Sequence, residues 1–276
     1  MMEYVWLKNH ILPKSDAYVH FDDRGYYFGD GIYEVIRIYN HQPFLLDAHM
    51  ERFARSAHEL DMPLPYSLSS IKDKTKELIT KNDINNGYVY IQMTRGEQPR
   101  DHLYSRDITP VMTGFTKKRE DGSTQKEGIS LWTTKDIRWL RCDIKTINLL
   151  GNVMAKRQAE DHACQEALLH RDGIVTEGSS SNIFMVKRGV LYTHPANHYI
   201  LNGITRQYTI AQAKQLDICV NETAFSLEQL QEADEVFATS TSLEVTPVHQ
   251  IKGDIDMKIK TGPVTEQLQQ GFSFSC

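Results

Sequence analysis

The sequence predicts a mixed α/β (α+β) fold divided into two domains. Three observations lead to this prediction: alternating apolar and polar runs typical of strands, apolar residues at helical spacing between them, and one charged stretch containing Gly122 and Ser123. We therefore expect a smaller N-terminal α/β domain over residues 1–118, a linker over 119–126 and a larger C-terminal domain over 127–276.

The N-terminal domain is expected to begin with a strand in its first six residues and to continue with a hairpin. In that hairpin, residues 34–39 pair with residues 44–46 across a turn. A helix should follow with Asp47 as its N-cap, and a second helix is expected over residues 67–81. The buried stripe of the first helix should consist of Phe53, Ala54, Ala57 and Leu60.

Residues 87–96 alternate cleanly and predict a strand with Val89, Ile91 and Met93 on its buried face. Tyr90 lies on the opposite face, which either lines a pocket or meets solvent. The C-terminal domain is expected to contain several further elements. They are strands near 129–133 and 166–170 flanking a helix at 148–164, a hairpin of 182–186 with 190–194, a helix starting near Ile204 and a strand at 235–238.

The composition is that of an ordinary globular chain of 276 residues, 40% hydrophobic and 24% charged. A net charge of −5 gives no reason to expect binding to nucleic acid or to an anionic membrane. No apolar run approaches the length that spans a bilayer, and no secretion signal is recognisable. The four cysteines lack metal-site or redox-pair spacing, so reduced thiols and a cytoplasmic location are expected.

Lys145 is the first candidate for chemistry, because Ile144, Ile147 and Leu149 could desolvate its ammonium group and lower its pKa. A lysine of that kind can attack a carbonyl and hold an aldehyde cofactor. Glu177, in a loop of small polar residues, could hold a protonated ring nitrogen. Taken singly, Lys145 also fits a solvated surface lysine and Glu177 an acidic turn residue.

Other segments could bind small anions. Ile204 and Thr205 open a helix whose free N–H groups would suit a phosphate, and the hydroxyls of Ser240 and Thr241 follow a strand. Either feature also fits ordinary helix or turn capping. Arg52 could supply the cation for a phosphate or simply cover its helix.

Arg100 and His102 could together bind a carboxylate, although without further context a solvated loop is the simpler interpretation. The sequence lacks a dinucleotide or phosphate-loop fingerprint, a Gly-x-Ser-x-Gly elbow and any His-x-x-x-His metal pair. No metal site is therefore expected.

Taken together, several segments resemble the fold-type IV pyridoxal-phosphate aminotransferases, most closely their bacterial D-amino-acid branch. The resemblance covers nearly the whole chain. Its most specific segments are residues 23–34, 138–150, 176–182, 193–197 and 202–206. One departure is Leu103-Tyr104-Ser105, where relatives often have an aromatic-proline step, and this departure bears on side-chain preference rather than on the cofactor residues.

The resemblance implies a role for each matching position. Lys145 matches the lysine that forms a Schiff base with pyridoxal 5'-phosphate, and Glu177 matches the acid that pairs with the pyridine nitrogen. The expected phosphate-binding group consists of Arg52, Ile204, Thr205, Ser240 and Thr241. The expected substrate-binding group consists of Tyr33, Tyr90, Arg100 and His102, with Ser179, Ser180 and Ser181 along the pocket and the ring.

The resemblance also implies the reaction and the partners. The enzyme would move the amino group of D-alanine and other D-amino acids to 2-oxoglutarate in a ping-pong sequence, and its partners would be small amino and keto acids. A homodimer is expected, with Arg100 and His102 acting across its interface. The alternatives are a branched-chain L-amino-acid aminotransferase, an (R)-amine transaminase, an aminodeoxychorismate lyase, or a catalytically silent binding protein of the same fold.

Overall fold

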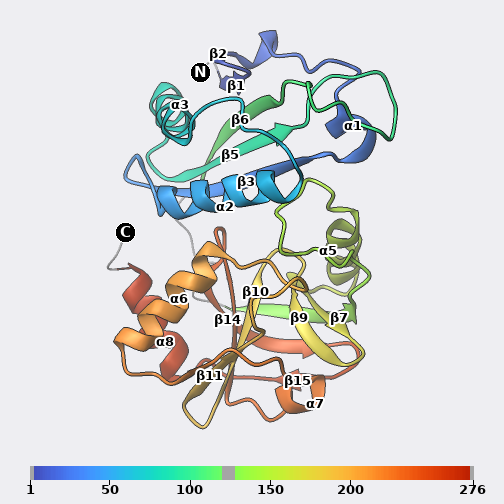
Figure 1. Cartoon of the computed structure of the whole chain (residues 1–276). Coiled ribbons are helices and arrows are strands. Elements are labelled where there is room, and N and C mark those ends of the chain that lie inside the picture. Colours follow the sequence, from blue (N-terminus) through green and yellow to red (C-terminus); the bar gives the residue numbers. More distant parts are fainter. Residues whose placement is uncertain (1–2, 120–127, 274–276) are drawn as a thin grey trace. The chain divides into compact units, whose positions relative to one another are not determined.

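The computed structural model describes residues 3–119 and 128–273 (Figure 1). It contains two compact units: Met1–Asp121 with Ile144–Asn148, and Gly122–Asp143 with Leu149–Cys276. Both units combine a β-sheet with helices, and the expected mixed α/β class is confirmed. Residues 120–126 of the expected linker lie outside the described residues.

The first unit is built on a six-stranded sheet with the strand order β2-β1-β6-β5-β3-β4, in which every pairing is antiparallel. Its strands are β1 Tyr4–Leu7, β2 His10–Pro13, β3 Gly31–Tyr39, β4 Gln42–Pro43, β5 Gly87–Thr94 and β6 Val111–Lys118. Its helical elements are the 3-10 turn η1 Lys14–Asp16, α1 Arg24–Phe28, α2 Leu46–Glu59 and α3 Leu68–Lys81. Apolar residues of α2 and α3 pack with those of β3 and β5 in one core (Figure 1).

The hairpin and the start of α2 differ from the sequence-based expectation. The returning strand is Gln42–Pro43, and Leu46 already belongs to the helix instead of pairing with β3. Leu45 is the N-cap, in the left-handed region at φ 52°, so Asp47 lies in the first turn and is not the cap. The predicted alternation of β5 is confirmed: Val89, Ile91 and Met93 are buried.

The second unit contains a nine-stranded mixed sheet with the main strand order β12-β11-β10-β13-β14-β7-β8-β9, and β15 pairs with β14. Its strands are β7 Ile129–Lys135, β8 Glu166–Arg171, β9 Ile174–Gly178, β10 Asn182–Lys187, β11 Val190–Thr193, β12 Val220–Asn221, β13 Glu235–Ser240, β14 Glu244–Lys252 and β15 Met257–Lys258. Its helices are α5 Leu150–Asp161, α6 Ile204–Gln215, α7 Leu227–Leu230 and α8 Pro263–Ser273. Strand β9 contacts β10 although the two stand far apart in the strand order, so the sheet curls towards closure.

The helix after Lys145 starts later than expected because the preceding residues are held by the first unit. Thr146 forms a β-bridge with Ile32, and the Ile147 N–H donates to the Gly31 carbonyl at 3.0 Å. The expected helix at 148–164 is therefore α5, from Leu150 to Asp161. The chain therefore passes from one unit to the other three times, whereas a division at 119–126 assumes a single passage.

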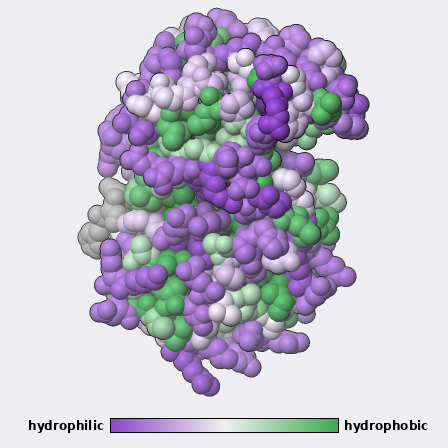
Figure 2. Space-filling view, viewed as in Figure 1, coloured by the Kyte–Doolittle hydropathy of each residue, from purple (hydrophilic) through white to green (hydrophobic). Residues whose placement is uncertain are grey.

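Hydrophilic side chains cover most of the molecular face shown in Figure 2. Over residues 3–119 and 128–273, none of the helices combines the length and the apolar character needed to cross a membrane.

Candidate active site

Lys145 lies in the first unit, in a short segment attached to the beginning of β3. Its carbonyl accepts a hydrogen bond from the Tyr33 N–H at 3.0 Å, and its own N–H donates to the Ser56 hydroxyl of α2 at 3.3 Å. The Nζ atom stands 4.0 Å from the centre of the Tyr33 ring. Both backbone groups of the lysine are therefore fixed, and its amine lies against an aromatic face.

Tyr33 is the first of three stacked aromatic rings on the face of the sheet opposite to Val89, Ile91 and Met93. Its ring stacks on Tyr90 at 5.4 Å between centroids, and Tyr90 stacks on Phe115 at 4.9 Å. Burial and the neighbouring Tyr33 raise the pKa of Tyr90, so its phenol keeps its proton and donates to Gln92 at 2.8 Å. The open choice for this strand face is answered in part: Tyr33 and Tyr90 are half-buried and stacked on each other, and Phe115 at the end of the stack is exposed.

Arg52 is held by a carboxylate that is completely buried. Its Nε and Nη2 atoms donate to the two oxygens of Glu34, each at 2.7 Å, which is the forked geometry that arginine and carboxylate favour. His49, one turn earlier on α2, donates from Nδ1 to Glu34 Oε2 at 2.7 Å. Strand β3 thus fixes the direction of the Arg52 side chain through Glu34.

The charges of this group follow from burial and proximity. Burial alone would raise the pKa of Glu34, but Arg52 and His49 outweigh it and hold that pKa at about 2. Burial lowers the pKa of His49 against the pull of Glu34, and the nearby Arg52 and Lys145 lower it further. His49 is therefore neutral, and the anion of Glu34 is matched by the Arg52 cation.

This pKa gives a prediction about acid stability. The pKa of Glu34 is about 2 in the folded protein and 4.5 ordinarily, so ionised Glu34 stabilises the fold above pH 4.5. The stabilisation, about 3 kcal/mol by linkage, should disappear as the pH falls through about 2. Urea unfolding of wild type and Glu34→Gln at several pH values should show a shallower acid dependence in the variant.

The control for this experiment is Glu51→Gln, which removes an exposed carboxylate from the same helix. It should keep the pH dependence of the wild type. An identical acid dependence in wild type and Glu34→Gln would contradict the assignment of a depressed pKa to Glu34.

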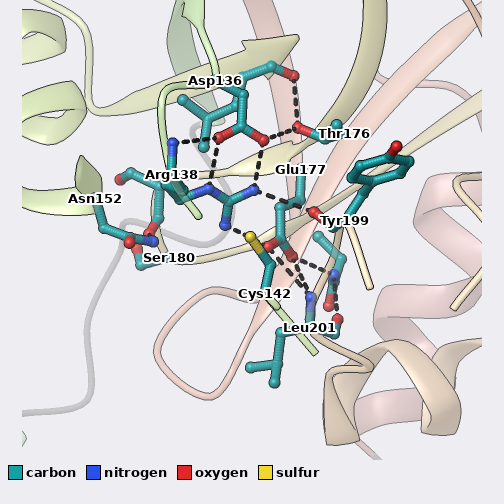
Figure 3. Close-up of polar contacts among 12 residues, drawn as sticks. Asp136, Arg138, Cys142, Asn152, Thr176, Glu177, Ser180, Tyr199 and Leu201 are labelled. Carbon is teal, nitrogen blue, oxygen red and sulfur yellow. Dashed lines mark hydrogen bonds and ion pairs between the residues drawn. The ribbon is translucent and has the colours of Figure 1, made fainter. Parts of the chain in front are cut away.

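Glu177 lies in the second unit, at the centre of a hydrogen-bond network (Figure 3). Its carboxylate accepts from Arg138 Nη1 at 2.6 Å, from Asn182 Nδ2 at 2.9 Å and from the Leu201 N–H at 3.1 and 3.2 Å. Arg138 is in turn held by Asp136 through two bonds of 2.9 Å. The acid is therefore fixed from three directions.

Burial raises the pKa of Glu177 to about 7, despite the opposing effects of Arg138 and the Leu201 N–H. Its charge is thus incompletely compensated by the surrounding protein. A protonated ring nitrogen would supply the missing positive charge, because an added cation favours the ionised acid. The buried carboxylate therefore fits the pyridine nitrogen of pyridoxal phosphate.

The three serines after Glu177 converge on one buried carboxylate, that of Glu166 on β8. Its oxygens accept from the hydroxyls of Ser179, Ser180 and Ser181, and from the N–H groups of Ala167, Ser179 and Ser180. The Ser180 and Ser181 hydroxyls lie at 2.8 and 3.1 Å. The loop is consequently fixed by Glu166, and Ser181 directs its hydroxyl towards that acid.

Two features of the second unit suit a phosphate: the N-terminus of α6 and the hydroxyls of Ser240 and Thr241. Helix α6 starts at Ile204 after Gly203, and no side chain caps its N-terminus. A Cβ at Gly203 would lie 2.2 Å from Asn182 Oδ1, so a larger residue there would clash. Thr239 of β13 pairs with Asn182 of β10. Ser240 and Thr241, which follow Thr239, are therefore close to Asn182, the residue that Gly203 contacts. Free N–H groups and neighbouring hydroxyls are typical partners of a phosphate.

Arg100 and His102 lie in an exposed loop of the first unit between β5 and β6. The Arg100 guanidinium stands 5.2 Å from the centre of the Phe28 ring, and the His102 ring lies 5.5 Å from the same ring. Both side chains therefore lie against the same ring.

The described structure thus brings Lys145, Tyr33, Tyr90 and Arg52 into the first unit, together with Arg100 and His102. The second unit holds the remaining candidates, which are Glu177, Ser181, Ile204, Thr205, Ser240 and Thr241.

Several polar partners in these networks were not assigned a role by the sequence. They are Glu34, His49, Asp136, Arg138, Glu166 and Asn182. The spacing of His49, Arg52 and Ser56 along one helix stripe was a usable signal, because residues three and four apart share a face. For Glu166 no local signal exists, since its serine partners lie more than ten residues away in the chain.

The chain is similar to known proteins along almost its whole length. Residues 31–251 match the family described as amino-transferase class IV. The chain is 47% identical to a D-alanine aminotransferase of Staphylococcus haemolyticus, over 99% of this chain and 97% of that protein. It is 46% identical to a D-alanine aminotransferase of Listeria monocytogenes, over 97% of this chain and 94% of the relative.

Solved structures give the same fold. A branched-chain amino acid aminotransferase of Escherichia coli superposes with a TM-score of 0.92 at 28% identity, covering 99% of this chain and 94% of that one. A putative 4-amino-4-deoxychorismate lyase of Legionella pneumophila has a TM-score of 0.85 at 25% identity, with 95% and 97% covered.

Proposed function

The chain belongs to the class IV aminotransferases, and from this premise we propose that it transfers the amino group of D-alanine and other D-amino acids to 2-oxoglutarate. The observation that carries the proposal is its similarity to D-alanine aminotransferases over almost the full length of both chains. Branched-chain aminotransferases share the fold at lower identity, and for that reason L-branched substrates are the second candidate.

The proposed cofactor is pyridoxal 5'-phosphate, which when bound withdraws electrons from the substrate carbon next to the amino group. Arg52 and the N-terminus of α6, with the hydroxyls of Ser240 and Thr241, are proposed to hold its phosphate. The fixed direction of Arg52 on Glu34 supports this role, because a cation held in place loses little freedom on binding an anion.

Lys145 is proposed as the amine that holds the cofactor's aldehyde and as the base that takes the proton from the substrate Cα. Its amine lies against the face of Tyr33, and its backbone is hydrogen-bonded on both sides, which limits where Nζ can reach. The same amine would carry that proton until it is returned.

Glu177 is proposed to keep a proton on the pyridine nitrogen. Its carboxylate is buried and held by Arg138, Asn182 and Leu201, so its position is fixed. Burial disfavours the cationic form of Arg138, but Glu177 and Asp136 favour that form more strongly. The pKa of Arg138 is therefore raised, and Arg138 remains charged. The surrounding protein thereby favours the ionised form of Glu177 once a cation arrives.

The substrate carboxylate is proposed to bind Tyr33, Arg100 and His102, and Arg100 and His102 are proposed to serve the neighbouring subunit of a homodimer. Holding the carboxylate on one side and the amino group on the other leaves only one face of Cα turned to Lys145. Selection of the D-enantiomer is the expected consequence.

The test is to incubate the purified protein with 2-oxoglutarate and, separately, D-alanine, L-alanine or L-leucine. We expect turnover of D-alanine at least roughly a hundredfold faster than of either L-amino acid, because a site built to pair polar groups rejects a mismatched substrate strongly. Amino donor and keto acid should react in turn, giving parallel lines in double-reciprocal plots.

Each alternative has its own signature in the same assay. Preference for L-leucine would favour the branched-chain activity, and preference for a simple (R)-amine would favour an amine transaminase. Release of pyruvate from aminodeoxychorismate without a keto acid would favour the lyase. A protein without cofactor absorbance after addition of pyridoxal phosphate would favour a silent binding protein.

A further inference from the structure

Arg24, the first residue of α1, is a buried arginine that reaches the loop carrying Arg100 and His102. Its side chain is only 4% exposed. Its Nη1 atom donates to the Asp101 carbonyl at 2.5 Å, and its Nη2 atom donates to the His102 carbonyl at 3.3 Å. One guanidinium therefore holds two consecutive peptide groups of an otherwise exposed loop.

The position of Arg24 is set by Asp30, which lies between α1 and β3. Asp30 Oδ2 accepts from Arg24 Nε at 2.9 Å and from Arg95 Nε at 2.8 Å. Arg95 is itself tied to the Leu60 and Asp61 carbonyls at 2.8 and 3.1 Å. A buried Arg-Asp-Arg group thus connects the end of β5, the turn after α2 and the loop.

The backbone between these residues is also paired. The Arg24 N–H donates to the Gly96 carbonyl at 2.9 Å, and the Arg95 N–H donates to the Asp30 carbonyl at 3.0 Å. These bonds fix where the loop departs, whereas the Arg24 side chain fixes its farther part, at Asp101 and His102. The two sets of contacts act on different stretches of the loop.

Phe28 of the same short helix completes the arrangement. Its ring lies 4.8 Å from the Arg24 guanidinium carbon and 5.2 Å from that of Arg100, and 5.5 Å from the His102 ring. Both side chains proposed to bind a carboxylate therefore rest on a ring that is adjacent to Arg24. A displacement of Arg24 would move the peptide groups and the ring that orient them.

We propose that Arg24, with Asp30 as its counter-ion, is a positioning residue for recognition of the substrate carboxylate. It acts through Arg100 and His102 and does not touch the substrate. The inference rests on the proposed function, because it assigns Arg24 to the carboxylate site of that reaction. Lysine cannot replace it, since one ammonium cannot span Asp30 and two carbonyl groups in fixed directions.

The experiment compares wild type with Arg24→Lys, which keeps the charge and removes the fork. Steady-state kinetics with D-alanine and inhibition by propionate, a carboxylate without an amino group, are measured together. We expect the KM for D-alanine and the Ki of propionate to rise in parallel by roughly ten- to a hundredfold. The kcat and the absorbance of the bound cofactor should stay close to wild type.

The matched control is Arg106→Lys, at an exposed position farther along the same loop, where Arg106 pairs with Asp61. It should leave KM and Ki unchanged. If Arg24→Lys does not yield folded protein, Asp30→Asn carries the same test, because it keeps Arg24 and removes the negative charge of the counter-ion that directs it. The same parallel rise is expected.

A double-mutant cycle separates positioning from a general structural role. In an Arg100→Ala background, Arg24→Lys should raise the propionate Ki only slightly further, because the group through which Arg24 acts is already gone. Full additivity, or a fall in kcat with unchanged Ki, would overturn the proposal. Failure of the proposed function would instead appear in the wild type, as absent turnover of D-alanine.

Discussion

Replacing Lys145 with alanine should lower turnover of D-alanine by roughly 10⁴-fold or more, because both the covalent attachment and the proton transfer depend on its amine. The absorbance of lysine-bound pyridoxal phosphate should disappear as well. Borohydride reduction of the wild-type protein, followed by peptide mass mapping, should place the trapped cofactor on the peptide that contains Lys145.

The size of this effect follows from how the lysine is held. The Tyr33 N–H and the Ser56 hydroxyl fix the backbone of Lys145 on both sides, so its amine is presented from one fixed position that alanine cannot supply. Burial, the Arg52 cation and the lysine amine all lower the pKa of His49, so His49 is a weak proton acceptor and a poor substitute base.

The control for this variant is Lys76→Ala, which removes an exposed lysine from α3. It should keep full activity and the cofactor absorbance. Retention of turnover by Lys145→Ala, or a trapped cofactor on another lysine, would show that the attachment lies elsewhere.

The regular elements were predictable where local pattern alone determines them. Alternation in β5 places Val89 and Ile91 in the core as expected, and helical spacing in α3 places Ile71 and Leu78 in the same core. The start of α2 was not predictable in the same way. Asp47 has the residue type of an N-cap, but Leu45 takes that position in a left-handed conformation.

The candidate site was only partly predictable, for a physical reason. Motif segments such as 176–182 are continuous in the chain, and they locate Lys145 and Glu177. Their partners come from distant segments: Glu166 on β8 accepts from Ser179, Ser180 and Ser181, and Asp136 accepts from Thr176 at 3.0 Å. Pairing of this kind depends on sheet register, which a single sequence does not specify.

Replacing Glu177 with glutamine should lower kcat with D-alanine by roughly a hundred- to a thousandfold, the size expected when one fixed charge that supports the transition state is removed. Glutamine keeps the shape of the side chain but cannot hold a proton on the pyridine nitrogen through a negative charge. The cofactor should still bind, and its absorbance should change with pH in a different way from wild type.

The hydrogen bonds around Glu177 determine whether the glutamine substitution changes anything besides the charge of the side chain. Glutamine can still accept from Asn182 or Leu201 through its carbonyl oxygen, whereas its amide faces Arg138, which loses an anionic partner. Asp136 continues to pair with Arg138 through two bonds, so the guanidinium stays compensated. The main loss should therefore fall on kcat and not on folding.

The matched control is Asp172→Asn, which removes an exposed carboxylate in the turn between β8 and β9. Asparagine tolerates the left-handed conformation of that position, where φ is 48°, so neither stability nor activity should change. If Glu177→Gln retained kcat within roughly threefold of wild type, the ring nitrogen would not depend on this acid. The buried charge of Glu177 would then serve only to fix Arg138 and the backbone at Leu201.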